Sequence, residues 1–401
     1  MHKSEQLDVA VAGGGPVGGY IATKTAEKGY NTTIFEKKAK IGRPVGCAGL
    51  VSNRTLKFLN LPKEKIIQNK IKGANIHSPS GKTLTIGGDK IHAYVIDRVK
   101  FDESIIEKAV ENGSELILKH KLINAKKYGK RIEIKTNGNK KYFSKILVGA
   151  DGPFSKTRSI FNLPEPKEKL KGIGAEIKNV ELNPDFVEIF LGDKIAPGFF
   201  SWLIPTNGRG TKARMGLCIS EEATNTTKHF FSSFFVDKRV KPFLKNVKVE
   251  KKIAGTIPLG LIKKSFSDNF LLVGDAAEQI KPTSGGGLFT GLTSAQHSVS
   301  VILEALQKNN FSEDFLKKYQ KSWKKTIGHE IKIGMAFRKI YKKFSDEQIN
   351  HYLDKLDKPE IKKVIRDYGD IDFPSKLVKP LFFKAPYFLK FLPGYIKNKF
   401  F

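Results

Sequence analysis

The spacing of three glycines near the N-terminus constrains the fold of this chain more than any other feature. Gly13, Gly15 and Gly18 form a G-x-G-x-x-G pattern between the strand-like run LDVAVAG and a helical run over residues 16–28. In such a pattern the first glycine permits a tight turn, the second lets a pyrophosphate approach the backbone, and the third lets the helix pack on the strand. The helix N-terminus then offers amides and a positive dipole end to the phosphates. The pattern predicts a Rossmann-like α/β unit that binds a dinucleotide.

An acidic residue at the end of the next strand supports this interpretation. Glu36 ends the run NTTIFE, eighteen residues beyond Gly18, where a carboxylate can bind the hydroxyls of an adenosine ribose. A glycine turn with no ligand is the alternative, but the strand, the helix and the acid occur together. The residues predicted at this end of the dinucleotide are Gly13, Gly15, Pro16, Val17, Gly18, Glu36 and Lys37.

The charge of the chain is strongly basic. The 71 Lys and Arg against 40 Asp and Glu give a net charge of +31, which favours polyanionic partners such as nucleic acid, anionic lipid or an acidic protein. Only 10 of the basic residues are Arg. Since specific base readout relies on bidentate Arg, we expect no nucleic-acid partner. A Lys-rich proteome is the alternative origin of the charge.

The cysteines and the N-terminal residues indicate in which compartment of the cell the protein works. Cys47 and Cys218 are far apart, without a CxxC pair, and the histidines show no ligand spacing, so we predict neither a disulfide framework nor a metal site. The N-terminus runs directly into an apolar strand rather than a secretory signal, and no run of eighteen apolar residues occurs. These features predict a cytoplasmic protein.

The order of strand-like and helical runs predicts a discontinuous architecture. The chain opens as strand–helix–strand, continues through strand-like segments with turn signals, and returns at 268–280 to a buried strand that ends in Gly-Asp. We therefore predict a Rossmann-like dinucleotide-binding domain, an inserted antiparallel β-sheet domain for the substrate, and a helical C-terminal region. The predicted limits are 1–72, 96–165 and 262–310 for the first domain, 73–95 and 166–261 for the second, and 311–401 for the third.

Two later motifs narrow the choice of dinucleotide. The tetrapeptides GADG (149–152) and GDAA (274–277) each follow a strand-like run. Together with the N-terminal glycines they resemble the three signatures of para-hydroxybenzoate-hydroxylase-type flavoproteins, and this resemblance implies FAD. Asp275, at a strand end, can accept hydrogen bonds from the ribityl hydroxyls of such a cofactor.

Within that group, four segments resemble the geranylgeranyl reductase family, which includes the archaeal digeranylgeranylglycerophospholipid reductases. They are PVGCAGLVS (44–52), YVIDRVKFD (94–102), GFFSWLIP (198–205) and PTSGGG (282–287). Phe200 stands where many members have Tyr, and Ile204 stands where many have Phe. The resemblance implies that FAD also contacts Cys47, Ala48, Gly49, Arg98, Asp151, Gly152, Gly274, Asp275, Ala276, Gly285, Gly286, Gly287 and Leu288.

The family's reaction gives these parts a physical meaning. It reduces isolated isoprenoid double bonds, which are unactivated, so a protein that does this must supply a reduced flavin, an apolar tunnel and a placed acid. The resemblance places Cys47 near the flavin ring and facing the substrate, as an acid, a redox gate or a packing residue. A buried Cys is more often inert than reactive, and we expect Cys218 to belong to the core.

Two further residues keep two interpretations each. Arg98 is a FAD contact or an ordinary surface arginine, and Trp202 is a wall of the lipid tunnel or an aromatic residue of the sheet core. We take the first interpretation of each as the prediction. Phe200 is predicted to contact the substrate, although any role that the Tyr hydroxyl has in relatives is open here.

The C-terminal residues 376–401 interleave six Lys with eight aromatics and contain no acid. Such segments bind anionic interfaces, because aromatics sit at the headgroup level and Lys adds Coulomb attraction. We predict peripheral association with the inner face of the cell membrane; a helix docked on the protein's own core is the alternative.

The predicted activity is an FAD-dependent reductase that saturates geranylgeranyl chains of archaeal ether-lipid precursors. No second dinucleotide pattern occurs, so the electron donor is left as ferredoxin, a reduced deazaflavin or transiently bound NAD(P)H. An FAD monooxygenase or epoxidase of the same fold is the first alternative. A flavin-carrying protein that binds RNA or membranes without turnover is the second.

Overall fold

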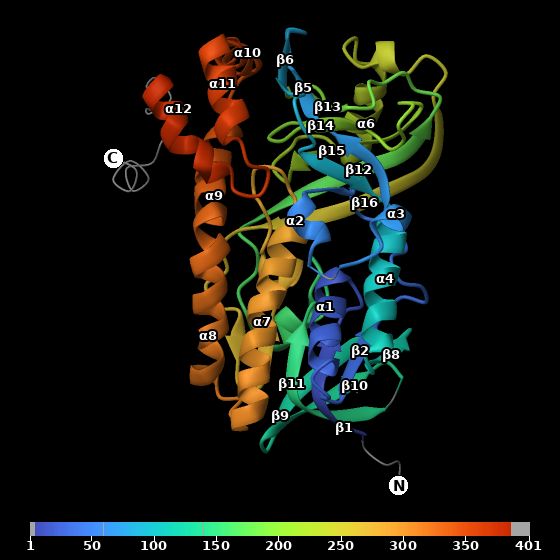
Figure 1. Cartoon of the computed structure of the whole chain (residues 1–401), viewed down its shortest axis with the longest axis vertical. Coiled ribbons are helices and arrows are strands. Elements are labelled where there is room, and N and C mark those ends of the chain that lie inside the picture. Colours follow the sequence, from blue (N-terminus) through green and yellow to red (C-terminus); the bar gives the residue numbers. More distant parts are fainter. Residues whose placement is uncertain (1–4, 59, 139, 386–401) are drawn as a thin grey trace.

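The computed structural model describes residues 5–58, 60–138 and 140–385. Two large sheets form two bodies stacked along the long axis, and the C-terminal helices run beside both of them (Figure 1). A small third sheet lies in the chain segment that links the two bodies. The mixed α/β architecture, with a Rossmann-like unit, an inserted sheet and a helical C-terminal region, confirms the predicted fold class.

The first sheet carries the N-terminal glycine motif. Its main path runs β17-β18-β11-β1-β2-β8, and its central strands pair in parallel, while the hairpin β9–β10 extends β11 in antiparallel fashion. The strands are β1 (Glu5–Ala12), β2 (Thr32–Glu36), β8 (Glu115–Leu118), β9 (Leu122–Tyr128), β10 (Arg131–Thr136), β11 (Lys141–Gly149), β17 (Phe266–Ser267) and β18 (Phe270–Leu272).

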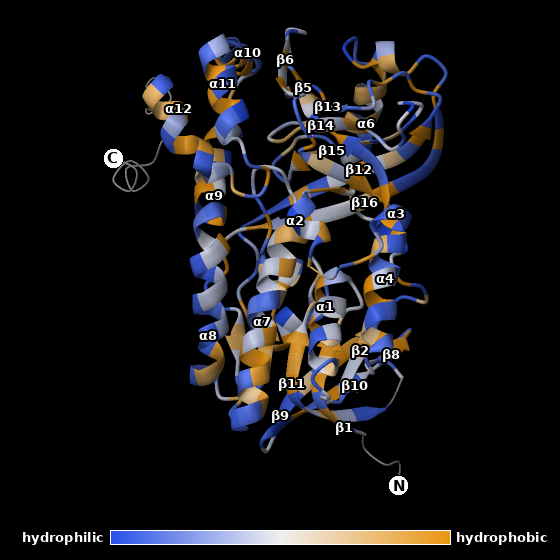
Figure 2. Cartoon of the chain, viewed as in Figure 1, coloured by the Kyte–Doolittle hydropathy of each residue, from blue (hydrophilic) through white to orange (hydrophobic). Residues whose placement is uncertain are grey.

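The central strands of this sheet are apolar on both faces because helices cover them. All five residues of β2 are buried, as expected for a parallel strand between two layers. The residues of β1, β11 and β18 join α1 and α7 in one continuous core, and Figure 2 shows this concentration of hydrophobic residues. The helices around this unit are α1 (Pro16–Ala26), α4 (Arg98–Glu111), α5 (Lys156–Ile160), α7 (Leu288–Lys308) and α8 (Glu313–Trp323).

The second sheet is built mainly from the inserted segment. Its order is β16-β12-β15-β14-β13-β5-β6, antiparallel except for the β13–β5 pair. The strands are β5 (Gly73–His77), β6 (Thr83–Gly87), β12 (Glu168–Lys178), β13 (Phe186–Phe190), β14 (Ser201–Pro205), β15 (Lys212–Ser220) and β16 (Lys248–Leu259). One face packs on α6 (Thr227–Val236) in a separate core, a helix that the strand-like interpretation of this segment missed.

The small sheet joins the two bodies. It contains β3 (Leu50–Val51), β7 (Ala93–Ile96) and β4 (Ile67–Ile71), in that order. The predicted domain limits at 72/73 and 95/96 assign β4 and most of β7 to different domains, although these strands pair. The short helices α2 (Asn53–Leu56) and α3 (Lys63–Ile66) belong to the same linking segment.

The C-terminal region is helical, as expected. A π-helical turn (Lys324–Gly328) joins α8 to α9 (His329–Tyr341), and α10 (Asp346–Leu356), α11 (Pro359–Tyr368) and α12 (Val378–Lys384) follow. The predicted basic-aromatic tail lies mostly outside the described residues, beyond Ala385. Within the described part of the chain, no helix is both long and apolar enough to span a membrane.

Candidate active site

The N-terminal glycine loop connects β1 to α1 with the geometry that a dinucleotide requires. Gly13 has a φ of +112°, and a Cβ there would lie 2.3 Å from the carbonyl oxygen of Ala150. A Cβ on Gly18 would lie 2.0 Å from the carbonyl oxygen of Gly13, so α1 packs directly on the end of the strand. Nothing lies within 4 Å of a Cβ on Gly15. The second glycine therefore borders open space, where a pyrophosphate is expected to lie.

Glu36 ends β2 beside this loop and is 8% exposed. Its Oε2 accepts a hydrogen bond from the amide of Gly14 (2.8 Å), and its Oε1 accepts one from the amide of Lys38 (2.8 Å). Each carboxylate oxygen retains a further lone pair. These two hydrogen bonds fix the loop and leave lone pairs on Glu36 that can accept hydrogen bonds from ribose hydroxyls. Lys37, the next residue, is exposed to solvent.

The GADG motif lies next to the first loop, because Ala150 contacts Gly13. The carboxylate of Asp151 accepts hydrogen bonds from the hydroxyls of Ser155 (2.6 Å) and Thr157 (2.8 Å) and from the amide of Thr157 (2.9 Å). Asp151 thus holds the start of α5 and fixes the turn that continues into Gly152. A direct contact between Asp151 and FAD stays a prediction.

The GDAA motif places a carboxylate without a protein partner in the site. Among the described residues, the carboxylate of Asp275 has no hydrogen-bond partner, and burial raises its pKa while Arg98 lowers it. A Cβ on Gly287 would lie 2.6 Å from its Oδ1, so the following glycine loop closes over Asp275. A partly buried acceptor of this kind fits a ligand that brings its own hydroxyl donors. Gly274 packs against Val17, and Ala276 is fully buried.

Two helices begin at this site without a side-chain cap. Gly15 precedes α1, whose first residue is Pro16, and Gly287 precedes α7, whose first residue is Leu288. By contrast, a Ser, Thr or Asp side chain caps α2, α4, α5, α6, α8 and α10. Uncapped amides and the helix dipole favour an anionic ligand at both positions. The residues present therefore fit FAD, which would extend from the Gly15 loop past Asp275 to the Gly285–Gly287 loop.

Arg98 and Cys47 lie together in the structure. Arg98 begins α4 and makes two hydrogen bonds of 3.1 Å to Asp102. Burial opposes its charge, but Asp102 and Cys47 together raise its pKa above the usual range. The sulfur of Cys47 also accepts a hydrogen bond from the amide of Gly49 (3.3 Å). Arg98 is thus an internal partner of Cys47 rather than an ordinary surface arginine; its contact with FAD stays a prediction.

The sequence interpretation missed Arg214, which reaches this loop from β15 in the other sheet. Its Nη1 donates to the carbonyl oxygens of Ala48 (2.8 Å) and Ile96 (2.9 Å), and its Nη2 donates to Oε1 of Gln68 (2.8 Å). An arginine within the otherwise apolar strand run ARMGLCIS was the available signal. The partners lie 118 to 166 positions away in the chain, so no local pattern could identify them.

Phe200 and Trp202 lie on the face of the second sheet that looks toward the first. Trp202 covers Gly216, whose Cβ would lie 2.5 Å from the indole ring, and the rings of Phe200 and Trp202 meet edge to face at 6.0 Å. On the same face of β16, a Cβ on Gly255 would lie 3.8 Å from the carbonyl oxygen of Gly46, in the loop of residues 46–49 that contains Cys47 (the Cys47 loop). Both aromatic residues are partly buried, next to Cys218, which is buried as predicted.

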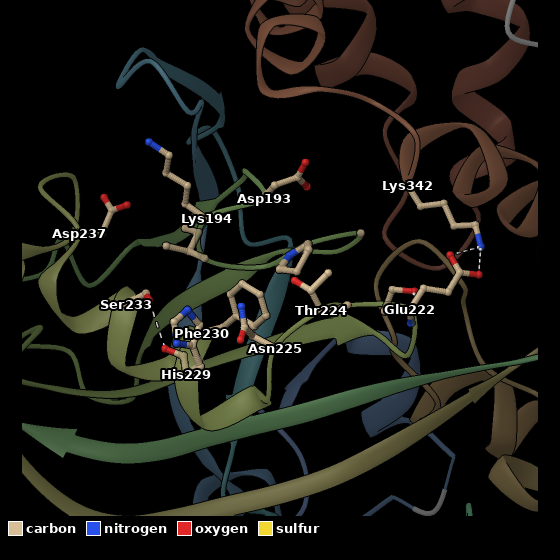
Figure 3. Close-up of a pocket in the computed structure, with 15 residues that line it drawn as sticks. Asp193, Lys194, Glu222, Thr224, Asn225, His229, Phe230, Ser233, Asp237 and Lys342 are labelled. Carbon is tan, nitrogen blue, oxygen red and sulfur yellow. Dashed lines mark hydrogen bonds and ion pairs between the residues drawn. The ribbon is translucent and has the colours of Figure 1, made fainter.

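A separate cavity of about 770 Å³ lies at the other side of this sheet (Figure 3). Its lining mixes charged side chains, such as Asp193 and Lys342, with apolar ones, such as Ile195 and Phe230, and Lys342 pairs with Glu222 at 2.9 Å. None of the site residues predicted from the sequence lines it. Over residues 5–58, 60–138 and 140–385, no cluster of three His, Cys, Asp or Glu side chains could hold a metal ion.

Together, the uncapped helices, the Asp275 carboxylate and the flanking sheet fit a flavoprotein fold with an inserted β-sheet domain. A family model described as "FAD binding domain" matches residues 6–327. The chain belongs to this FAD-binding family, within the group that contains the digeranylgeranylglycerophospholipid reductases. FAD is its cofactor.

Similar proteins cover almost the whole chain. An uncharacterized protein of Methanocaldococcus jannaschii, MJ1520, is 35% identical over 94% of this chain and 95% of its own length. The digeranylgeranylglycerophospholipid reductase of the same organism is 30% identical over 97% and 98%. A geranylgeranyl bacteriochlorophyll reductase-like structure from Thermoplasma acidophilum has a TM-score of 0.86 at 24% identity, covering 97% of this chain and all of that one.

Proposed function

We propose that this protein is an FAD-dependent reductase that saturates the isoprenoid double bonds of geranylgeranyl chains in archaeal ether-lipid precursors. One observation carries the proposal: the Cys47 loop, the Gly285–Gly287 loop and the Phe200–Trp202 strand meet between the two sheets. The near full-length similarity to a named digeranylgeranylglycerophospholipid reductase supports the same activity. Nothing in the site favours the monooxygenase or epoxidase alternative over it.

Each group of residues in the site has a role that follows from its chemistry. Bound FAD supplies the hydride equivalents for an alkene. The amides of α1 and α7 bind its anionic groups, Asp275 accepts from its hydroxyls, and Glu36 accepts from its ribose. Phe200, Trp202 and Ile257 offer an apolar wall to the isoprenoid chain. Cys47 holds a proton at Sγ beside this wall, where an unactivated alkene requires a proton donor.

The role of Cys47 is tested with the variants Cys47→Ala and Cys47→Ser. FAD-loaded protein is supplied with dithionite under anaerobic conditions, and mass spectrometry follows saturation of digeranylgeranylglyceryl phosphate. We expect turnover to fall about a hundredfold or more in both variants, the usual scale for losing a general acid, with normal flavin content. The matched control is Cys218→Ala, which removes the buried thiol and should retain turnover. Undiminished turnover in both Cys47 variants removes Cys47 from the mechanism.

The partners belong to this proposal as well. The substrate is a prenylated glycerophospholipid. The electron donor is ferredoxin, a reduced deazaflavin or NAD(P)H; the basic charge of the chain favours an acidic carrier protein such as ferredoxin.

The protein works at the inner face of the cell membrane, where the basic-aromatic residues 376–401 bind anionic lipid. Deleting this segment is expected to abolish sedimentation with anionic vesicles; unchanged sedimentation contradicts the membrane proposal.

A further inference from the structure

Arg338 of α9 is a buried cation whose contacts lead to the substrate side of the site. Its side chain is 2% exposed, and its Nε and Nη2 donate to Oε1 of Glu168 at 3.0 and 2.6 Å. Its Nη1 donates to the carbonyl oxygen of Gly198 (2.9 Å). Burying a guanidinium is costly unless its charge is paired and its N–H groups are bonded. Both conditions are met here, so α9 is tied to the first residue of β12 and to the turn before β14.

The turn that Arg338 binds carries two stacked phenylalanines. The guanidinium lies over the ring of Phe199, with Cζ 5.2 Å from the ring centroid, within the range of a cation–π contact. The rings of Phe199 and Phe200 stack at 4.2 Å with an interplanar angle of 19°. Further along α9, the hydroxyl of Tyr341 donates to the carbonyl oxygen of Phe199 (2.9 Å). Two side chains of one helix therefore fix both the backbone of this turn and its first aromatic ring.

The same two phenylalanines connect the Gly285–Gly287 loop to the apolar wall proposed for the lipid. A Cβ on Gly285 would lie 3.7 Å from Cζ of Phe199, so this ring contacts the loop. The ring of Phe200 in turn meets that of Trp202 edge to face at 6.0 Å. The position of the Phe199 ring therefore sets where the apolar wall lies relative to the loop that precedes α7.

We propose that Arg338 is a positioning residue of the lipid site, which fixes the stacked pair Phe199–Phe200 and thereby the apolar wall beside the FAD site. Arg338 contacts neither the reacting atoms nor the cofactor in this proposal. A small displacement of a bound substrate slows a reaction strongly even when the cofactor stays in place. The meaning of this for turnover rests on the proposed reductase function, whereas the effect on the wall itself does not.

The first test probes the wall without any lipid, by acrylamide quenching of tryptophan fluorescence in the FAD-loaded full-length chain. The chain has two tryptophans. Trp323 is 0% exposed, whereas Trp202 is partly buried in the wall. Quenching therefore reports on Trp202, and the variant Trp202→Phe verifies this assignment. We expect Arg338→Met, which keeps the length of the side chain but loses its hydrogen bonds and charge, to raise the quenching constant, because the wall packs less firmly.

The second test is the anaerobic reoxidation of dithionite-reduced protein by digeranylgeranylglyceryl phosphate. We expect Arg338→Met to slow reoxidation about tenfold or more, the scale of a small misplacement of substrate, with normal FAD content. Arg338→Lys keeps the charge and should lose less. The matched control is Arg239→Gln, since the Arg239 side chain is 8% exposed, pairs with Asp237 at 2.9 Å and also donates to backbone carbonyl oxygens. The control should leave both measurements unchanged.

Two further variants guard against failure of Arg338→Met to fold, since that change leaves Glu168 without its partner. The double variant Arg338→Met/Glu168→Gln removes both charges and leaves no buried charge unpaired. Phe199→Leu keeps the ion pair and removes the ring. Both should produce the same two changes.

The two tests separate this proposal from the proposed function. If the wild-type protein reduces the lipid, normal reoxidation in every folded variant of Arg338 and Phe199 overturns the proposal. If the wild-type protein reduces no prenyl lipid, quenching alone decides. Unchanged quenching in these variants then overturns the proposal, whereas increased quenching supports it and counts against the proposed function alone.

Discussion

The two helix N-termini at the flavin site both lack a side-chain cap, and they differ in what holds them. The loop before α1 is fixed by backbone contacts, with Gly18 against Gly13, and by one carboxylate, Glu36. The loop before α7 closes through the backbone of Lys281 onto Gly285 and Gly286. The Lys281 ammonium then binds Asp372 at 3.1 Å and the carbonyl oxygen of Ile371 at 2.8 Å. One anion-facing turn is thus specified by local glycine spacing, and the other by a buried ion pair with the C-terminal region.

The largest loss of stability is expected at Gly18, where the backbone of α1 packs directly against the backbone of the glycine loop. Gly18→Ala places a Cβ 2.0 Å from the carbonyl oxygen of Gly13, and neither group can move without shifting α1 from the sheet. We expect a loss of about 4 kcal/mol or more in the free energy of unfolding, the scale of severe overpacking, and no FAD retention. Denaturant unfolding and the flavin absorbance of purified protein measure the two quantities.

The matched control in the same loop is Gly15→Ala. Its Cβ meets nothing within 4 Å, so the protein without flavin should unfold within about 1 kcal/mol of wild type. The added methyl group occupies the space expected for the pyrophosphate, so FAD affinity should fall. Equal FAD affinity in wild type and Gly15→Ala would place the cofactor elsewhere.

A somewhat smaller effect is expected from the ion pair that holds the second loop. Asp372→Asn leaves Lys281 buried beside a neutral amide, with side chains that are 10% and 1% exposed in the wild type. Removing one partner of such a pair costs about 3 to 5 kcal/mol. Because this pair holds the loop before α7, we expect the FAD affinity of Asp372→Asn to fall, although the loop before α1 is unchanged.

An exposed ion pair provides the control for this charge change. Glu181 and Lys245 lie 2.9 Å apart, with side chains 66% and 65% exposed, so Glu181→Gln should change stability by less than about 1 kcal/mol. If Asp372→Asn behaves like Glu181→Gln, the C-terminal region does not hold the loop before α7.

The smallest effect is expected at Glu278, which follows the GDAA motif and is 2% exposed. Burial raises its pKa to about 7 from 4.5, despite the attraction of Arg158. Since the folded state favours the protonated carboxyl, this contribution to stability is complete below about pH 4.5 and is lost as pH rises through 7. Glu278→Gln cannot ionise and should be more stable than wild type above pH 7, by about 3 kcal/mol. A stability difference that does not vary with pH would contradict this assignment.

The contrast between the two loops also explains what the sequence could predict. Glycine spacing and the strand-end acid Glu36 predicted a dinucleotide site at the first loop, because these contacts are local or follow the topology of a parallel sheet, whereas the choice of FAD came from the resemblance to known flavoproteins. The pairing of Lys281 with Asp372 and of Arg214 with Ala48 joins residues 91 and 166 positions apart, and side-chain chemistry alone does not reveal such pairs. The helix α6 was missed because the phenylalanine-rich run HFFSSFFV has strand propensity, whereas its Phe230, Phe231 and Phe234 cover the inserted sheet.

The most direct test of the proposed function is an anaerobic single turnover. Protein with bound FAD is reduced by dithionite, freed of excess reductant and mixed with digeranylgeranylglyceryl phosphate, while absorbance follows the flavin and mass spectrometry follows the lipid. We expect the flavin to reoxidise without oxygen and the lipid to gain two hydrogens for each flavin oxidised. A flavin that stays reduced with this lipid, and reoxidises only in air with an oxygenated product, would contradict the reductase and establish a monooxygenase.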